Sequence, residues 1–199
     1  MTGLALLAGG STLAALPPID KPIDEAIHDL HRRRNRVLTG SLMALGGTGL
    51  LLWPVAAVAA ASTDAWMSLR IFSIAIATLG SMFLALAFLA AVALAWPNET
   101  EIDRGAARLL HQTAHLATWS VSAPLAAIFV AATTSTAWQA DIAGPALVLT
   151  AGVKIATVIV EIIGTGQRCG WNAGGWARGA SGYATVAWYA TLLVALADA

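Results

Sequence analysis

The chain has 199 residues, of which 58% are hydrophobic and 11% are charged, and its formal net charge at pH 7 is zero. Soluble globular domains carry about 25% charged residues, so this composition excludes an ordinary soluble domain and predicts an integral membrane protein. The balanced charge gives no basis for a nucleic-acid partner. The single cysteine, Cys169, excludes an intramolecular disulfide and a metal site built from several cysteines.

Residues 1–16, MTGLALLAGGSTLAAL, form the first apolar stretch. A helix of this length would rise about 24 Å, which is short of the roughly 30 Å of a bilayer's hydrocarbon core. No basic residue precedes the stretch, and the PPIDKP that follows is a poor cleavage site, so we do not expect a secretory signal peptide. We expect a peripheral, re-entrant or mobile segment, with a short sixth span as the alternative.

Residues 22–36, PIDEAIHDLHRRRNR, predict an amphipathic helix. Ile23, Ile27 and Leu30 recur at helical spacing and form a narrow apolar face. Acidic residues near its start and basic residues near its end suit the helix dipole. The basic cluster consists of Arg32, Arg33, Arg34 and Arg36. We favour a solvated lead-in whose arginines set the membrane topology, and the alternative is a surface helix that docks anionic lipid or a partner.

Five further apolar runs are long enough to cross a membrane, and their length without alternating polarity predicts helices rather than barrel strands. They cover residues 38–61, 69–96, 106–132, 144–165 and 181–198. The predicted fold is all-α, a polytopic transmembrane bundle of about five spans over residues 38–199. An N-terminal peripheral segment with the amphipathic cytoplasmic helix precedes it over residues 1–37. The first span contains glycines that would let another helix approach closely, namely Gly40, Gly46, Gly47 and Gly49.

The distribution of Lys and Arg predicts the orientation of the bundle. The basic cluster before the first span and the arginines after the second and fourth spans fall on one side of a five-span topology. The first and third connections, ASTDAWMS and TTSTAWQADIAG, contain neither Lys nor Arg. The positive-inside rule then places the N-terminus in the cytoplasm and the C-terminus outside, and the composition suggests a bacterial plasma membrane.

Two polar stripes interrupt the apolar spans. Both repeat at intervals of four, three and four residues, which places each set on one face of a helix. The stripe of the fourth span consists of Thr150, Lys154, Thr157 and Glu161. The stripe of the third span consists of His111, His115, Thr118 and Ser122. A short outer connection joins the two spans into an antiparallel hairpin, so we expect the stripes to face each other with a His–Glu contact near the inner surface.

The ionic residues within the apolar spans suggest two alternative functions, assembly with other membrane chains and transport. A charged side chain at the middle of a membrane costs about 3 kcal/mol on insertion scales, so it normally faces protein or a cavity. We favour polar glue in a small non-enzymatic subunit, which assembles with itself or with other membrane proteins. The alternative is a proton-coupled transporter or ion channel in which Glu161 and a histidine titrate.

Other functions have less support in the sequence. His111 and His115 have metal-ligand spacing on a helix, but no third ligand is evident, so we expect no metal site. A b-type haem carrier would require an axial histidine from a second span. The remaining histidines precede the first span, so this function has little support. The motifs GxSxG and HExxH are absent, so we expect no enzyme activity and no cofactor. The expected partners are the lipid bilayer and other membrane-embedded chains, as in a homo-oligomer.

Overall fold

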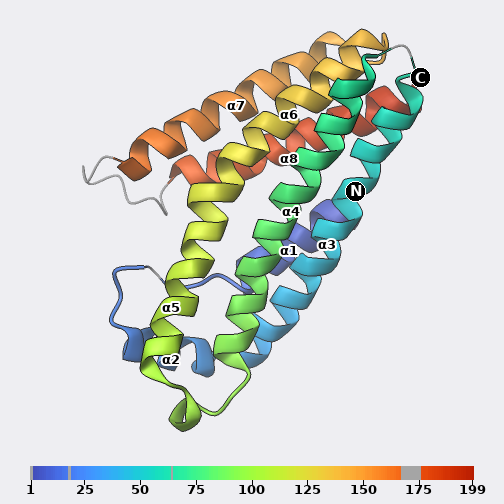
Figure 1. Cartoon of the computed structure of the whole chain (residues 1–199). Coiled ribbons are helices and arrows are strands. Elements are labelled where there is room, and N and C mark those ends of the chain that lie inside the picture. The colour runs from blue at the N-terminus through green and yellow to red at the C-terminus, as the bar shows by residue number, and fades with distance from the viewer. Residues whose placement is uncertain (1, 18, 64, 167–175) are drawn as a thin grey trace. The chain divides into compact units, whose positions relative to one another are not determined.

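The computed structural model describes residues 2–17, 19–63, 65–166 and 176–199, and within these ranges every regular element is a helix. Figure 1 shows the helices in chain order. The elements are α1 (Thr2–Leu13), α2 (Ile23–Arg32), α3 (Arg34–Ala61), α4 (Met67–Ala95), η1 (Glu99–Glu101), α5 (Arg104–His115), η2 (Leu116–Val121), α6 (Ser122–Gln139), α7 (Pro145–Gly166) and α8 (Trp176–Ala197). The predicted all-α class is confirmed.

Five helical stretches of the described chain are long and apolar enough to span a membrane, and the five predicted runs coincide with them. They are α3, α4, the continuous stretch from α5 to α6, α7 and α8. With 28 and 29 residues, α3 and α4 rise about 42 Å, which exceeds the hydrocarbon thickness of roughly 30 Å. The helices extend past the apolar runs because polar end residues such as Arg34 and Gln139 also take helical conformation.

Two compact units share the long helices. Unit 1 consists of Met1–Leu50 with Ser81–Ser122, and unit 2 consists of Leu51–Gly80 with Ala123–Ala199. Unit 1 therefore contains α1, α2, η1, α5 and η2, together with the first part of α3 and the last part of α4. Unit 2 contains α6, α7 and α8 and the remaining parts of α3 and α4.

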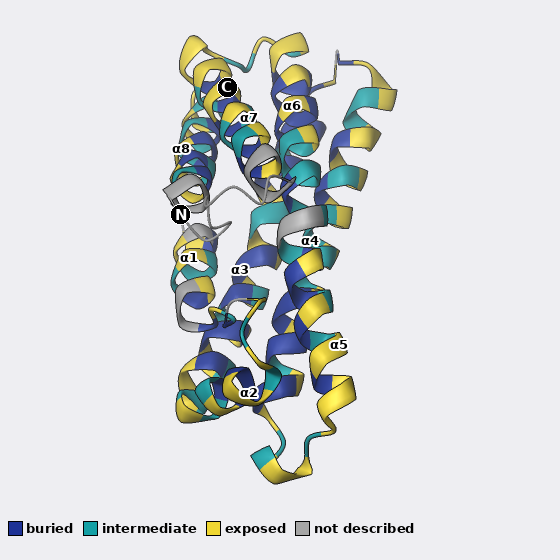
Figure 2. Cartoon of the chain, turned by 90° about the vertical axis from the view of Figure 1, so that its left-hand side faces the viewer, coloured by how far each residue is buried: buried dark blue, intermediate teal, exposed yellow. Residues whose placement is uncertain are grey.

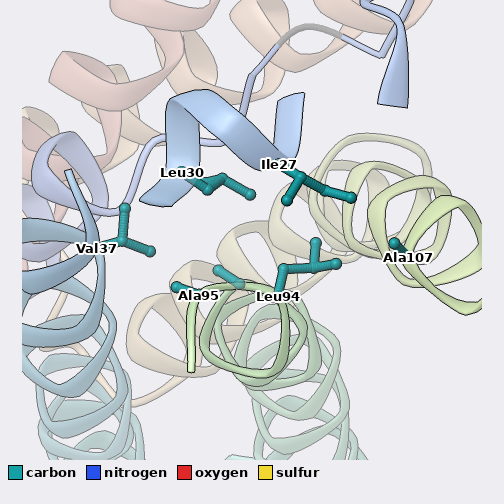
Figure 3. Close-up of a cluster of buried hydrophobic side chains, with 7 residues drawn as sticks. Ile27, Leu30, Val37, Leu94, Ala95 and Ala107 are labelled. Atoms are coloured by element: carbon teal, nitrogen blue, oxygen red, sulfur yellow. The ribbon is translucent and has the colours of Figure 1, made fainter. Parts of the chain in front are cut away.

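In unit 1 the apolar face of α2 is buried against neighbouring helices. Ile27 and Leu30 are each 1% exposed and belong to one hydrophobic cluster. The cluster also contains Val37, Ala91, Leu94, Ala95 and Ala107. Figure 3 shows Ile27 and Leu30 directed from α2 toward Leu94. Burying each of these large side chains contributes roughly 1.5–3 kcal/mol. The apolar face of α2 is therefore occupied by protein within unit 1.

The helix α1 packs closely against α3 in the same unit. A Cβ atom on Gly47 would overlap the backbone of Leu7, and a Cβ atom on Gly10 would overlap the backbone of Ala44. Because Leu7 lies beside Gly47 and Gly10 beside Ala44, the two helices run antiparallel. With 12 residues α1 rises about 18 Å, less than the roughly 30 Å of a bilayer's hydrocarbon core, and it lies along part of α3.

The glycines of α3 divide into two sets. Gly47 and Gly40 contact α1, as the sequence predicts for close helix approach. Gly46 and Gly49 lie on the exposed side of α3, and nothing lies within 4 Å of the position that a Cβ atom would occupy at either residue. Glycine therefore permits close packing within unit 1 on one side of α3 and leaves the other side open.

The third spanning stretch changes its winding at η2, a π-helical turn between α5 and α6. Pro124 follows this turn, and its ring cannot tolerate the carbonyl four residues earlier in an ideal α-helix, so a wider turn relieves the clash. The hydroxyl of Thr118 donates to the carbonyl of Ala114 at 2.8 Å, and that of Ser122 donates to the carbonyl of Thr118. Both predicted stripe hydroxyls thus bond the backbone of their own helix around the irregular turn. Figure 2 shows buried and exposed residues interleaved along α5 beside it.

The same substitution at two adjacent glycines of α3 should have different effects on the stability of the protein. Gly47→Ala should lower the stability by about 1–3 kcal/mol because the new methyl group meets the backbone of α1. Gly46→Ala should leave the stability unchanged or raise it by up to about 1 kcal/mol, since alanine favours a helix and meets open space. Thermal unfolding of both variants in the same detergent measures the difference. Equal effects would contradict the packing of α1 on α3.

Candidate functional site

Lys154 of α7 is buried in unit 2 and contacts α8. Its side chain is 5% exposed, and its ammonium donates to Ser181 Oγ at 2.6 Å and to the carbonyl oxygen of Ser181 at 3.2 Å. Protein of the described chain therefore encloses this lysine. The partner of the lysine is a serine on the last predicted span, which supplies both a hydroxyl and a backbone acceptor.

A second polar contact joins the same two helices. The hydroxyls of Thr150 and Thr191 share a hydrogen bond of 2.8 Å. Thr150 and Lys154, the first half of the predicted stripe on α7, therefore contact α8. Figure 1 shows α7 and α8 running side by side. Sequence reasoning missed Ser181 and Thr191, because Ser181, Thr185 and Thr191 are spaced four and six residues apart and do not repeat the spacing of the other two stripes.

The second half of the stripe continues along α7. Thr157 donates from its hydroxyl to the carbonyl of Lys154 at 2.8 Å, so this hydroxyl serves its own helix. Glu161 is 5% exposed and lies seven residues beyond Lys154, about 10 Å along the helix axis. One face of α7 therefore holds an ammonium and a carboxyl group, both enclosed by protein.

Aromatic side chains complete the packing around α8. Trp188 is fully buried, and its indole N–H donates to Thr134 Oγ1 of α6 at 3.0 Å. Phe129 meets Trp188 edge to face with ring centroids 5.1 Å apart. An indole needs a partner for its N–H when buried, so Thr134 fixes the ring. This contact holds α8 to α6 within unit 2.

Two histidines of α5 form a separate buried pair in unit 1. His111 and His115 are 3% and 8% exposed, and their rings meet edge to face with centroids 4.8 Å apart. The Nε2 atom of each ring lies within 3.0 Å of the carbonyl oxygen of Pro17. Since that oxygen can only accept, both rings carry a proton on Nε2. The histidines therefore clamp the connection between α1 and α2, and ligation of a metal or haem through Nε2 would require this clamp to open.

The predicted His–Glu contact would join His111 of unit 1 to Glu161 of unit 2, and it stays a prediction. Within the described ranges, no group of three or more His, Cys, Asp or Glu residues is placed to hold a metal ion.

The four arginines of the basic cluster differ in their contacts, and two of them bond backbone carbonyls. Arg33 donates to the carbonyl of Ala15 and Arg34 donates to the carbonyl of Trp96, each at 2.5 Å. These two arginines satisfy backbone acceptors where the chain leaves its helices. Arg32 and Arg36 are exposed, and neither has a hydrogen-bond or ion-pair partner among the described residues.

Ionic contacts fasten the polar side of α2. Asp24 pairs with Arg104 at 2.7 Å, and Asp29 pairs with Lys21. The hydrogen bond from Lys21 lowers the pKa of the Asp29 carboxyl below its usual value, despite the opposing effect of desolvation. Asp29 is therefore ionised at neutral pH and its charge is compensated by Lys21.

The pair formed by Lys154 and Ser181 also resembles a base beside a nucleophile, as in hydrolases that use a serine–lysine pair. Both side chains are buried, with 5% and 6% exposure, so a substrate would have to displace protein to reach the hydroxyl. The lysine also bonds the backbone carbonyl of the same serine, which is a geometry that joins helices. Packing of α7 against α8 explains both hydrogen bonds of the Lys154 ammonium, the one to Ser181 Oγ and the one to the Ser181 carbonyl.

Removing one partner of this pair should cost more than removing both. Ser181→Ala leaves the Lys154 ammonium buried with one acceptor fewer, and we expect a loss of about 1–3 kcal/mol. Adding Lys154→Met should recover part of that loss because no ammonium then needs an acceptor. Thr48→Ala is the matched control, since the hydroxyl of Thr48 is also buried but bonds the carbonyl of Ala44 in its own helix, away from Lys154 and Ser181. A double variant less stable than Ser181→Ala would contradict the pairing.

Comparison of the chain with protein-family models, curated proteins and solved structures gives no match. The chemistry open to the site therefore follows from its own side chains. Lys154, Ser181, Thr150 and Thr191 join α7 to α8, and the two histidines fasten the connection between α1 and α2.

Proposed function

We propose that the chain is a small non-enzymatic membrane protein that works by associating with a second copy of itself or with another membrane subunit. The observation that carries this proposal is an exposed seam on α3. Its exposed residues Gly46, Gly49, Trp53, Ala56 and Ala60 repeat at intervals of three and four residues. Gly46 and Gly49 belong to unit 1, and Trp53, Ala56 and Ala60 belong to unit 2. Within each unit, this spacing along α3 is one at which small residues let a partner helix approach, and we call the five residues the seam.

The small size of the seam residues supports association. In lipid, helices gain no hydrophobic advantage from meeting, so they associate where small residues let their backbones approach. The exposed face of α4 serves as an internal comparison, because it carries large side chains suited to acyl chains. These include Ile71, Phe72, Leu79, Met82, Leu86 and Leu89. The seam of α3 has four small residues out of five, although α3 also exposes Leu42 and Leu50, and α4 also exposes Ser68 and Ala75.

The buried polar groups fit the same proposal. Lys154, Thr150 and their partners on α8 hold two helices of one chain together, as expected of polar glue. We further propose that the five apolar helices cross a bacterial plasma membrane with the basic end of α3 in the cytoplasm and the C-terminus outside. The asymmetry of Lys and Arg between the connections supports this orientation.

Leucines placed on the seam should separate the complex without unfolding the chain. In Gly46→Leu/Gly49→Leu the new side chains enter open space within the chain, so stability should be kept while association is lost. Native mass spectrometry of mildly solubilised membranes measures the assembly. Gly152→Leu is the matched control, because Gly152 of α7 is also exposed with open space around it but lies outside the seam. A wild-type chain that is monomeric and free of partner subunits would contradict the proposal, as would equal dissociation in the control.

A proton-coupled transporter is the second candidate. It is favoured by the burial of two ionisable groups, Lys154 and Glu161, on one face of α7. Buried ionisable residues within membranes frequently mark ion pathways.

Transport predicts that a neutral isostere stops proton movement. Glu161→Gln should abolish proton flux in proteoliposomes, because an amide of the same shape cannot exchange a proton. Thr157→Val is the control on the same face, since its hydroxyl bonds only its own helix. Absence of flux with the wild-type chain, or flux that survives in Glu161→Gln, would exclude this mechanism.

A further inference from the structure

An open hollow lies in unit 1 where α2 meets α3. It has a volume of about 710 Å³ and is lined by Asp29, His31 and the consecutive residues Arg32–Arg36. Four of those five consecutive residues are arginines. Such a density of guanidinium groups at one concave surface is suited to an anion, because a guanidinium presents its donors in the fork that matches phosphate oxygens.

The hollow retains free donors after its internal bonds are made. Arg33 and Arg34 use a donor each on the carbonyls of Ala15 and Trp96. Arg32 and Arg36 are exposed and have no partner among the described residues. The only carboxylate of the lining, Asp29, is paired with Lys21 and therefore does not compensate the arginines.

Two helix ends meet at the hollow, the end of α2 at Arg32 and the start of α3 at Arg34, and their dipoles have opposite signs there. The helix α3 begins at Arg34 and has no acidic residue in its first turn. The first N–H groups of a helix and its dipole both favour an anion at this end. The arginines thus act together with the start of a helix of 28 residues.

We propose that this hollow binds the phosphate of an anionic phospholipid headgroup, with Arg32 and Arg36 as the principal cationic contacts. The residues that line this hollow are different from the five residues of the α3 seam. The site also gives the basic cluster a role beyond orienting the chain in the membrane.

The position of the first exposed apolar residue of α3 favours a lipid over a soluble phosphate. Leu42 is 68% exposed and lies six residues beyond Arg36, about 9 Å along the helix. The polar headgroup region of one leaflet is about 5–8 Å thick. A phosphate held by Arg36 would therefore place its acyl chains at the level of Leu42, where the apolar surface of α3 begins.

Lipid titration of the full chain tests the site. Native mass spectrometry in mild detergent compares binding of phosphatidylglycerol with binding of phosphatidylcholine. Arg32→Gln and Arg36→Gln should each weaken phosphatidylglycerol binding about fivefold, and the double variant about thirtyfold, with phosphatidylcholine binding unchanged. Arg108→Gln is the matched control, because Arg108 is an exposed arginine of α5 outside the hollow. Phosphatidylglycerol binding to the wild-type chain should also weaken as the salt concentration is raised. This second test uses no variant, so it does not depend on whether the variants fold.

Three outcomes would overturn the proposal. Equal weakening in Arg108→Gln would show attraction by overall charge without a defined site. Inorganic phosphate that binds alone as tightly as phosphatidylglycerol and displaces it would make the ligand a soluble anion. Equal affinity of the wild-type chain for the two lipids at low salt would show that the hollow selects no anionic headgroup.

Discussion

A backbone carbonyl left over where a helix breaks must find a donor inside the protein when water is scarce. The breaks of this chain are arranged around that constraint, and cationic or imidazole side chains supply the donors. The constraint is strongest at buried breaks, whereas at exposed breaks Arg33 bonds the carbonyl of Ala15 and Arg34 that of Trp96. At a partly buried break, Arg70 bonds the carbonyl of Ala59. The carbonyl of Pro17 has two donors, His111 and His115. These arginines and histidines, which stand out in the sequence as charges or possible ligands, therefore act here as hydrogen-bond donors to backbone carbonyls.

The same constraint explains the α7–α8 pair. Lys154 is too far from the helix ends to reach water easily, so its ammonium needs acceptors from protein, and Ser181 provides two. The hydroxyls of Thr150 and Thr191 then satisfy each other further along the helices. Glu161 lies about two turns beyond Lys154, so the face carries opposite formal charges without needing direct contact. This arrangement supports helix pairing more directly than ion movement, because each contact of Lys154 and Thr150 across helices ends on α8.

The apolar helices and the burial of the ionic residues could be predicted from the sequence, because they depend on the length of apolar runs and on the cost of exposing charge to lipid. The partners of the buried residues could not, because they depend on how each helix is rotated about its axis. The five apolar helices follow from unbroken runs, since lipid forces each backbone to bond within its own segment. The burial of Lys154 and Glu161 follows from the cost of exposing charge to hydrocarbon. The partner Ser181 did not follow, because the hydroxyls of the last apolar run do not repeat at helical intervals and hydropathy does not show which side of that run meets α7. Pro17 could not be found either, since any carbonyl looks alike in a sequence.

The two sides of α3 show why glycine alone does not identify an interface. Gly47 and Gly46 are neighbours, yet one touches the backbone of α1 and the other faces open space. Lipid chains pack as well on leucine as on glycine, so exposure to lipid by itself gives no reason for small residues at regular positions. A partner helix does give one, because its backbone must come close along a single seam. The exposed small residues Gly46 and Gly49 in unit 1 and Ala56 and Ala60 in unit 2 are therefore the basis of the proposal that a helix lies against this side of α3.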